Sequence, residues 1–145
     1  MTKPKSVLII DDDSDFVRAV GDLLTSAGYA VDSACNGRDG LSLAKTTQPD
    51  LILLDVMMTE RTEGFFTLQQ IRSVPALRHT PVIVASSIYT DQPSFKVNPD
   101  ADWLPADLFL PKPIDPARLI QESARLIAAS VAPESEASHV GSNGR

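Results

Sequence analysis

Four short apolar runs, each followed at once by polar or charged residues, constrain the fold more than any other feature of this sequence. Such runs, without polar interruption, are typical of strands that are buried on both faces of a sheet. A weaker strand candidate spans Tyr29–Ala34. The four runs and the residues after them are Val7–Ile10 before Asp11, Leu51–Leu54 before Asp55, Val82–Ala85 before Ser86, and Leu108–Leu110 before Pro111 and Lys112.

Helical patterns alternate with these strands. The first helix is expected to be capped by Ser14 or Asp15 and to end at Gly28. Asn36 can cap a second helix, a third is expected to end at Pro75, and Asp115 followed by proline is a good start for the last one. The first helix has helical spacing of its apolar residues, namely Phe16, Val20, Leu23, Leu24 and Ala27.

This alternation predicts an α/β fold, because parallel strands need helical crossovers that cover both faces of the sheet. Five units fit a doubly wound, five-stranded parallel sheet of the flavodoxin-like kind, with strand order 2-1-3-4-5. We expect one domain over residues 1–130 and a disordered tail over residues 131–145, which are rich in Ala, Ser, Glu, Gly and Pro.

The connection from Ile88 to Asp107 departs from a simple strand–helix repeat. It contains Pro93, Pro99 and Pro105, separated by five residues each, and prolines at that spacing exclude a normal helix interior. We therefore expect an atypical, proline-rich connection between the fourth and fifth strands, mostly loop with at most one helical turn.

Composition excludes several classes of function. The formal net charge of −6, with no basic run, argues against nucleic-acid binding. Cys35 is the only cysteine, so neither an internal disulfide nor a zinc site with two cysteines can form. The apolar stretch near the amino terminus is too short for a signal peptide or a membrane span, and we expect a cytoplasmic protein.

The polar residues that follow the strands are candidates for a common site. In open α/β sheets, ligands bind outside the carboxyl ends of the strands, so Asp11, Asp12 and Asp55 should meet at one rim. Clustered carboxylates repel one another and are kept mainly for cations. Oxygen ligands without His or Cys favour Mg²⁺ or Ca²⁺ over zinc. Mg²⁺ fits better, because the run Asp11–Asp13 lacks the spacing of a calcium-binding EF-hand loop. Asp13 is interpreted as a helix cap or turn residue.

Ser86 and Lys112 extend this site towards phosphate chemistry. A lysine and a magnesium ion would neutralise phosphoryl oxygens, and the Ser86 hydroxyl would donate a hydrogen bond. Asp55 could then act as a nucleophile that forms an aspartyl phosphate. Ser86 alone would be interpreted as a turn residue, and Lys112 alone as a solvated surface residue. The prediction of a phosphate site therefore depends on their occurrence together with the three aspartates at the ends of strands.

At this point the sequence resembles the receiver domain of two-component response regulators, of the stand-alone kind. The resemblance covers Val7 to about Ala129. Its matching stretches, in order, are Val7–Asp13, Asp50–Met58, Pro81–Ser86 and Phe109–Pro113.

The resemblance implies a role for each matching residue. Asp55 is the phosphoacceptor, and it binds magnesium together with Asp11, Asp12 and the backbone carbonyl of Met57. Ser86 and Lys112 contact the phosphoryl group, and Ser86 also moves in the switch. The aromatic switch position is Phe109, which could equally be a plain core residue, and the bond before Pro113 is expected to be cis.

The same resemblance implies the partners. A sensor histidine kinase or a histidine phosphotransfer protein donates the phosphoryl group, and the phosphorylated chain changes its contacts with a downstream protein. The chain then promotes only its own phosphorylation and dephosphorylation and is not otherwise an enzyme. We expect neither a nucleic-acid nor a membrane partner.

Two alternatives stay open. One is a receiver fold that serves as an interaction module without control by phosphorylation. The other is a phosphatase of the haloacid dehalogenase type, for which Asp11 and Asp13 have the right spacing. That family needs further acidic residues on a strand after the lysine, whereas Lys112 precedes only a helix and a polar tail. The sequence has no glycine-rich nucleotide-binding loop.

Overall fold

A computed structural model describes residues 4–55, 63–86 and 106–140 of the chain. Its centre is a five-stranded sheet in the order β2-β1-β3-β4-β5, and all neighbouring strands are parallel. This topology confirms the predicted fold class. The strands are β1 (Ser6–Ile10), β2 (Ala30–Ala34), β3 (Leu51–Asp55), β4 (Val82–Ser86) and β5 (Leu108–Pro111).

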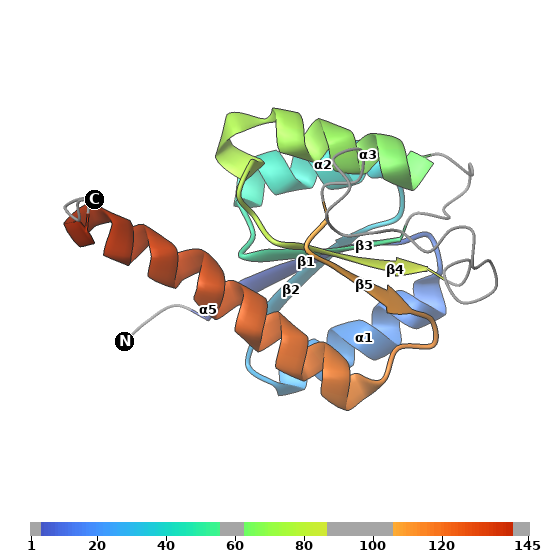
Figure 1. Cartoon of the computed structure of the whole chain (residues 1–145). Coiled ribbons are helices and arrows are strands. Elements are labelled where there is room, and N and C mark those ends of the chain that lie inside the picture. The colour runs from blue at the N-terminus through green and yellow to red at the C-terminus, as the bar shows by residue number, and fades with distance from the viewer. Residues whose placement is uncertain (1–3, 56–62, 87–105, 141–145) are drawn as a thin grey trace.

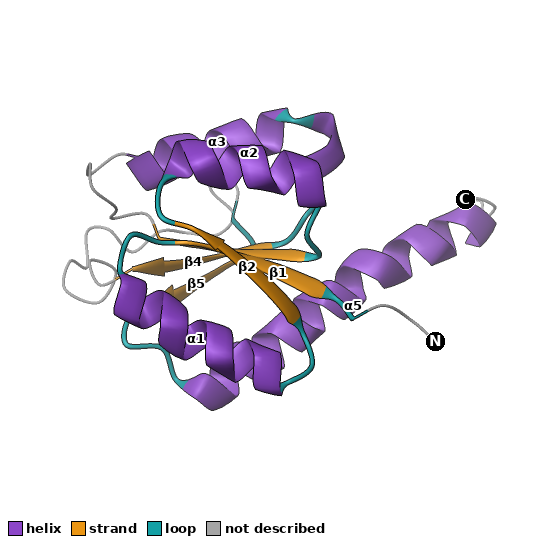
Figure 2. Cartoon of the chain, turned by 180° about the vertical axis from the view of Figure 1, so that it is seen from behind, coloured by secondary structure: helices purple, strands orange, loops and turns teal. Residues whose placement is uncertain are grey.

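Helices cover both faces of the sheet (Figure 1). One face carries α1 (Ser14–Ser26) and α5 (Pro116–Val140), and the other carries α2 (Gly37–Thr47) and α3 (Glu63–Ser73). The view from behind shows the same two layers (Figure 2). A short 3-10 helix, η1 (Pro75–Leu77), follows α3.

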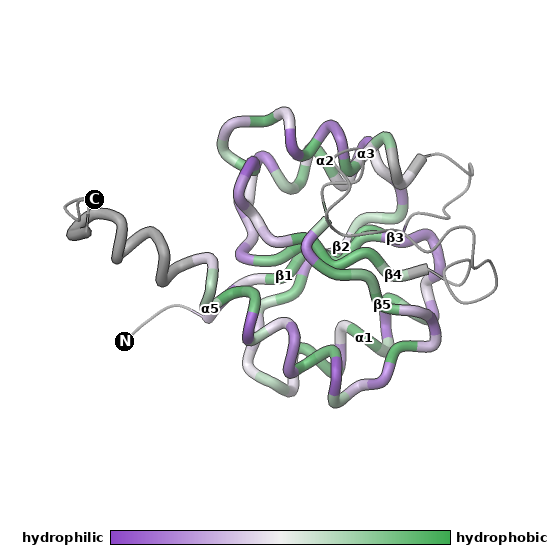
Figure 3. Tube along the Cα trace, viewed as in Figure 1, coloured by the Kyte–Doolittle hydropathy of each residue, from purple (hydrophilic) through white to green (hydrophobic). Residues whose placement is uncertain are grey.

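Four strands, β1, β3, β4 and β5, contribute to two apolar cores, because successive side chains point to opposite faces. Leu8 and Ile10 pack into the cluster under α2 and α3, whereas Val7 and Ile9 pack into the cluster with α1 and α5. Figure 3 shows the central strands in hydrophobic colours, between helices in which hydrophobic and hydrophilic residues alternate. The uninterrupted apolar runs in the sequence therefore reflect burial on both faces.

The helix ends follow local chemistry. The carboxylate of Asp13 accepts hydrogen bonds from the N–H groups of Asp15 and Phe16, at 3.1 and 3.2 Å, which confirms Asp13 as a cap. The expectation that Ser14 or Asp15 caps this helix was wrong, since the helix already begins at Ser14. Asn36 caps α2 as expected, and Gly28, with φ of 101°, follows the end of α1.

Two expectations concern segments at the edge of the described structure. Helix α5 continues to Val140, so residues 131–140 are helical where we expected a disordered tail. Pro133 lies within this stretch, although proline is unfavourable in a helix interior. Figure 1 shows the C-terminal part of α5 projecting past the sheet. The domain boundary at residue 130 stays a prediction. The proline-rich connection from Ile88 to Asp107 lies outside the described residues except for its last two positions, Ala106 and Asp107.

Among the residues that the structure describes, no helix is both long and apolar enough to cross a membrane.

Candidate functional site

Strand register brings the predicted site residues to one rim of the sheet. Ile10 pairs with Leu54, so Asp11 lies beside the end of β3, where Asp55 is the last residue. In the pairing of β4 with β5, Ser86 lies opposite Pro111, so Lys112 follows directly after the end of β5. Residues distant in sequence therefore meet because parallel strands end at the same edge.

Three carboxylates form an acidic cluster at this rim. Asp11, Asp12 and Asp55 each offer one oxygen, and these oxygens lie within 4.8 Å of one another. Asp11 and Asp55 are only 2% and 4% exposed, whereas Asp12 is exposed. A set of carboxylate oxygens on a partly buried rim fits a hard divalent cation such as Mg²⁺, which also offsets the repulsion among the carboxylates.

Lys112 supplies positive charge to the same cluster. Its ammonium donates to Oδ2 of Asp11 at 2.9 Å and lies 3.7 Å from Oδ2 of Asp55. The side chain is only 18% exposed, so Lys112 is not a solvated surface residue. The ammonium is therefore close enough to Asp55 to contact a group that is bound there.

The cluster is connected to the first turn of α1. Oδ1 of Asp11 accepts a hydrogen bond from the N–H of Asp13 at 2.9 Å, and Asp13 in turn caps the helix. In that first turn, the ring centroid of Phe16 lies 4.2 Å from the Lys112 ammonium. The sequence analysis treated Phe16 only as an apolar helix position, and no sequence pattern indicates its contact with Lys112.

The remaining predicted residues are placed in part. Ser86 is the last residue of β4, but its side chain lies outside the described residues, as does all of Met57. Phe109 is half-buried in β5 and packs against the core under α2 and α3. The Lys112–Pro113 peptide bond is cis, as the resemblance implies.

The acidic cluster can be reached from solution. A cavity of about 680 Å³ opens beside Asp11 and Asp12, and its other walls come from α1, the end of β2 and α2. Small ions in solution therefore have access to Asp11 and Asp12.

Comparison with known proteins identifies the class of this fold and site. The sequence profile described as "Response regulator receiver domain" matches residues 7–124. The chain therefore belongs to the family of response regulator receiver domains, which work in two-component signalling.

Curated relatives include proteins of different lengths. The polar-differentiation response regulator DivK of Brucella anthropi is 29% identical over 118 residues, which are 81% of this chain and 92% of that protein. The response regulator PleD of Caulobacter vibrioides is 35% identical over 82 residues, or 57% of this chain. This chain thus matches nearly all of DivK but spans only 18% of PleD.

Solved structures support the fold. The chemotaxis response regulator CheY4 of Vibrio cholerae has a TM-score of 0.71 and 27% identity, with 85% of this chain and 98% of that chain covered. The receiver domain of the sensor histidine kinase PA1611 of Pseudomonas aeruginosa, solved with a magnesium ion in its active-site cleft, has a TM-score of 0.75 and 21% identity. That comparison covers 86% of this chain and 98% of the PA1611 domain.

Proposed function

We propose that this receiver domain is a phosphorylation-dependent signalling switch that accepts a phosphoryl group on Asp55. One observation carries the proposal: the Lys112 ammonium lies between Asp11 and Asp55, at 2.9 and 3.7 Å, inside a cluster of three carboxylates. A carboxylate nucleophile, a set of metal ligands and a fixed cation are the parts that phosphoryl transfer to an aspartate needs.

The transfer step follows from these parts. An oxygen of Asp55 attacks the phosphorus of a phosphohistidine on the partner, the P–N bond breaks, and the histidine ring, already protonated on its other nitrogen, leaves as neutral imidazole. The Lys112 ammonium stabilises the negative charge on the phosphoryl oxygens. Asp11 and Asp12 would hold magnesium, which supplies further positive charge to those oxygens when it is bound. Ser86 and the Met57 carbonyl keep the roles that the resemblance implies.

Relatives support the choice of metal and donor. The PA1611 receiver domain, which shares the fold, carries magnesium in its active-site cleft and belongs to a sensor histidine kinase. The donor we propose is accordingly a sensor histidine kinase or a histidine phosphotransfer protein. The chain then acts on no other substrate and promotes only its own phosphorylation and dephosphorylation.

The output is a change in protein–protein contacts. A phosphoryl group adds roughly 1.5 to 2 negative charges and new acceptor oxygens. If two conformations of the domain differ by only a few kcal/mol, the new contacts of this phosphoryl group are enough to change their populations. The downstream target is a protein that binds the phosphorylated and unphosphorylated forms with different affinity.

The test is the intact mass of the protein after incubation with acetyl phosphate, with and without Mg²⁺. The wild type should gain one phosphoryl group only with Mg²⁺, and Asp55→Asn should gain none. Asp22→Asn is the matched control, because Asp22 is an exposed aspartate on α1 outside the cluster.

Other outcomes identify the alternatives. A phosphoryl group that Asp55→Asn still accepts would remove Asp55 from the proposal. Hydrolysis of simple phosphate esters that depends on Asp11 and not on Asp55 would indicate a phosphatase. A wild type that stays unmodified by both acetyl phosphate and a phosphorylated histidine donor would indicate an interaction module.

A further inference from the structure

The Lys112 ammonium has a third neighbour besides the two carboxylates. It lies over the ring of Phe16, 4.2 Å from the ring centroid. A cation within about 6 Å of an aromatic ring centroid is attracted by the ring's quadrupole, and the attraction is strongest where water is largely excluded. The Lys112 side chain is mostly buried, which favours such a contact.

Phe16 is held in place by its backbone and by its side chain. The backbone N–H of Phe16 donates to the carboxylate of Asp13 at 3.2 Å, and the backbone N–H of Asp13 donates to the carboxylate of Asp11 at 2.9 Å. The Phe16 side chain also packs against the apolar cluster that includes residues of α1 and α5. Because Lys112 bonds to Asp11 as well, the four residues form a closed circuit of contacts.

This circuit restrains a side chain that is otherwise flexible. Lysine has a four-carbon stem with many rotamers, and fixing such a stem costs conformational entropy. A hydrogen bond to Asp11 alone leaves the ammonium free to turn about that oxygen. The ring adds a second restraint from the side of α1, so that the ammonium stays near Asp55.

We propose that Phe16 is a positioning residue, whose ring holds the Lys112 ammonium where it can meet the phosphoryl group on Asp55. This inference rests on the proposed function of Asp55. An aliphatic residue at position 16 could fill the same apolar space but has no quadrupole to attract the cation. An aromatic replacement should therefore preserve the function, and an aliphatic one should not.

The first measurement compares rates of Asp55 phosphorylation by acetyl phosphate in saturating Mg²⁺. Phe16→Leu should lower the rate about three- to tenfold, the range of a modest cation–π contact, whereas Phe16→Tyr should stay within about twofold of the wild type. Leu23→Val is the matched control, because Leu23 packs against the same apolar cluster from α1 without a contact to Lys112 among the described residues. A Phe16→Leu rate equal to that of the wild type, or a Leu23→Val rate lowered as much, would overturn the proposal.

The second measurement does not depend on phosphorylation. A ring above the ammonium shifts the NMR signals of the Lys112 ε-methylene protons upfield, and Lys112→Arg identifies those signals by their loss. The shift should be present in the wild type and in Phe16→Tyr and absent in Phe16→Leu. Its absence in the wild type would overturn the inference. A wild type that shows the shift but accepts no phosphoryl group would instead overturn the proposed function and leave the contact established.

Discussion

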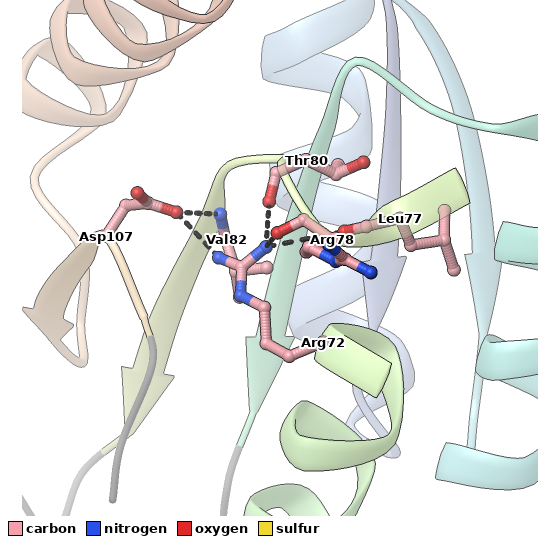
Figure 4. Close-up of polar contacts among 6 residues, drawn as sticks. All are labelled: Arg72, Leu77, Arg78, Thr80, Val82 and Asp107. Atoms are coloured by element: carbon pink, nitrogen blue, oxygen red, sulfur yellow. Dashed lines mark hydrogen bonds and ion pairs between the residues drawn. The ribbon is translucent and has the colours of Figure 1, made fainter. Parts of the chain in front are cut away.

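The guanidinium of Arg72, at the end of α3, lies 2.9 Å from the carboxylate of Asp107, which precedes β5 (Figure 4). The same carboxylate oxygen accepts the N–H of the first residue of β4 at 2.8 Å. The other terminal nitrogen of Arg72 lies within hydrogen-bond distance of three backbone carbonyl oxygens, from the last residue of η1 to the loop before β4. Those carbonyl groups belong to Leu77, Arg78 and Thr80.

Arg72→Ala should therefore destabilise the fold by about 2–3 kcal/mol, because it removes the charged partner of the Asp107 carboxylate and the side-chain donor of several carbonyl groups. Arg72→Lys should cost about 1 kcal/mol, since a point charge cannot replace the planar fork of donors. Urea unfolding measures both. Arg125→Ala is the control: Arg125 is 56% exposed and, within the described part of the chain, pairs only with Glu122 on its own helix, so it should cost less than about 0.5 kcal/mol. Equal effects of the two alanine variants would contradict this account.

The sequence predicted the sheet and its acidic rim because both depend on local patterns. Apolar runs such as Val7–Ile10 mark buried strands, and parallel strands necessarily end at one edge. The contact between Lys112 and the ring of Phe16 was not predictable, since it depends on how α1 lies relative to the loop after β5. The partners of Arg72 were missed for the same reason: Asp107 is 35 residues away in the chain, and no periodicity indicates a pair of that kind.

Gly40 is another position where the packing could not be predicted from the sequence. It lies in α2, and a Cβ atom there would come within 2.6 Å of Cδ1 and 2.8 Å of Cγ1 of Ile10, whose side chain is fully buried in β1. Gly40→Ala should cost about 1–3 kcal/mol through overpacking. The matched control is Gly21→Ala in α1, where the nearest atom, in Val31, is 3.8 Å away. That variant should gain about 0.5–1 kcal/mol from helix propensity. A thermal shift of the same sign in both would show that the close approach to Ile10 relaxes without cost.

Ser123 is a buried polar residue of α5. It is fully buried, and its hydroxyl has no hydrogen-bond partner among the described residues. Ser123→Ala should stabilise the fold by about 1 kcal/mol, because it removes a hydroxyl whose burial is uncompensated. Ser130→Ala, at an exposed position of the same helix, should give only the few tenths that helix propensity provides. If the two variants stabilise equally in urea unfolding, the Ser123 hydroxyl is satisfied in solution.

Metal affinity gives a test of the site that needs no phosphodonor. The Lys112 ammonium donates a hydrogen bond to Oδ2 of Asp11, and Asp11 is one of the carboxylates that would hold Mg²⁺. The ammonium also adds positive charge to the cluster. Lys112→Ala should therefore bind Mg²⁺ about three- to tenfold more tightly, since like charges within a partly buried site repel. Asp12→Asn should weaken binding about tenfold or more by removing a charged ligand. Lys45→Ala, which removes a lysine from the exposed surface of α2, controls for the change in net charge. Calorimetric titration in which Lys112→Ala and Lys45→Ala shift the affinity equally would mean that Lys112 acts only through the overall field of the protein, and that its contact with Asp11 does not compete with the ion.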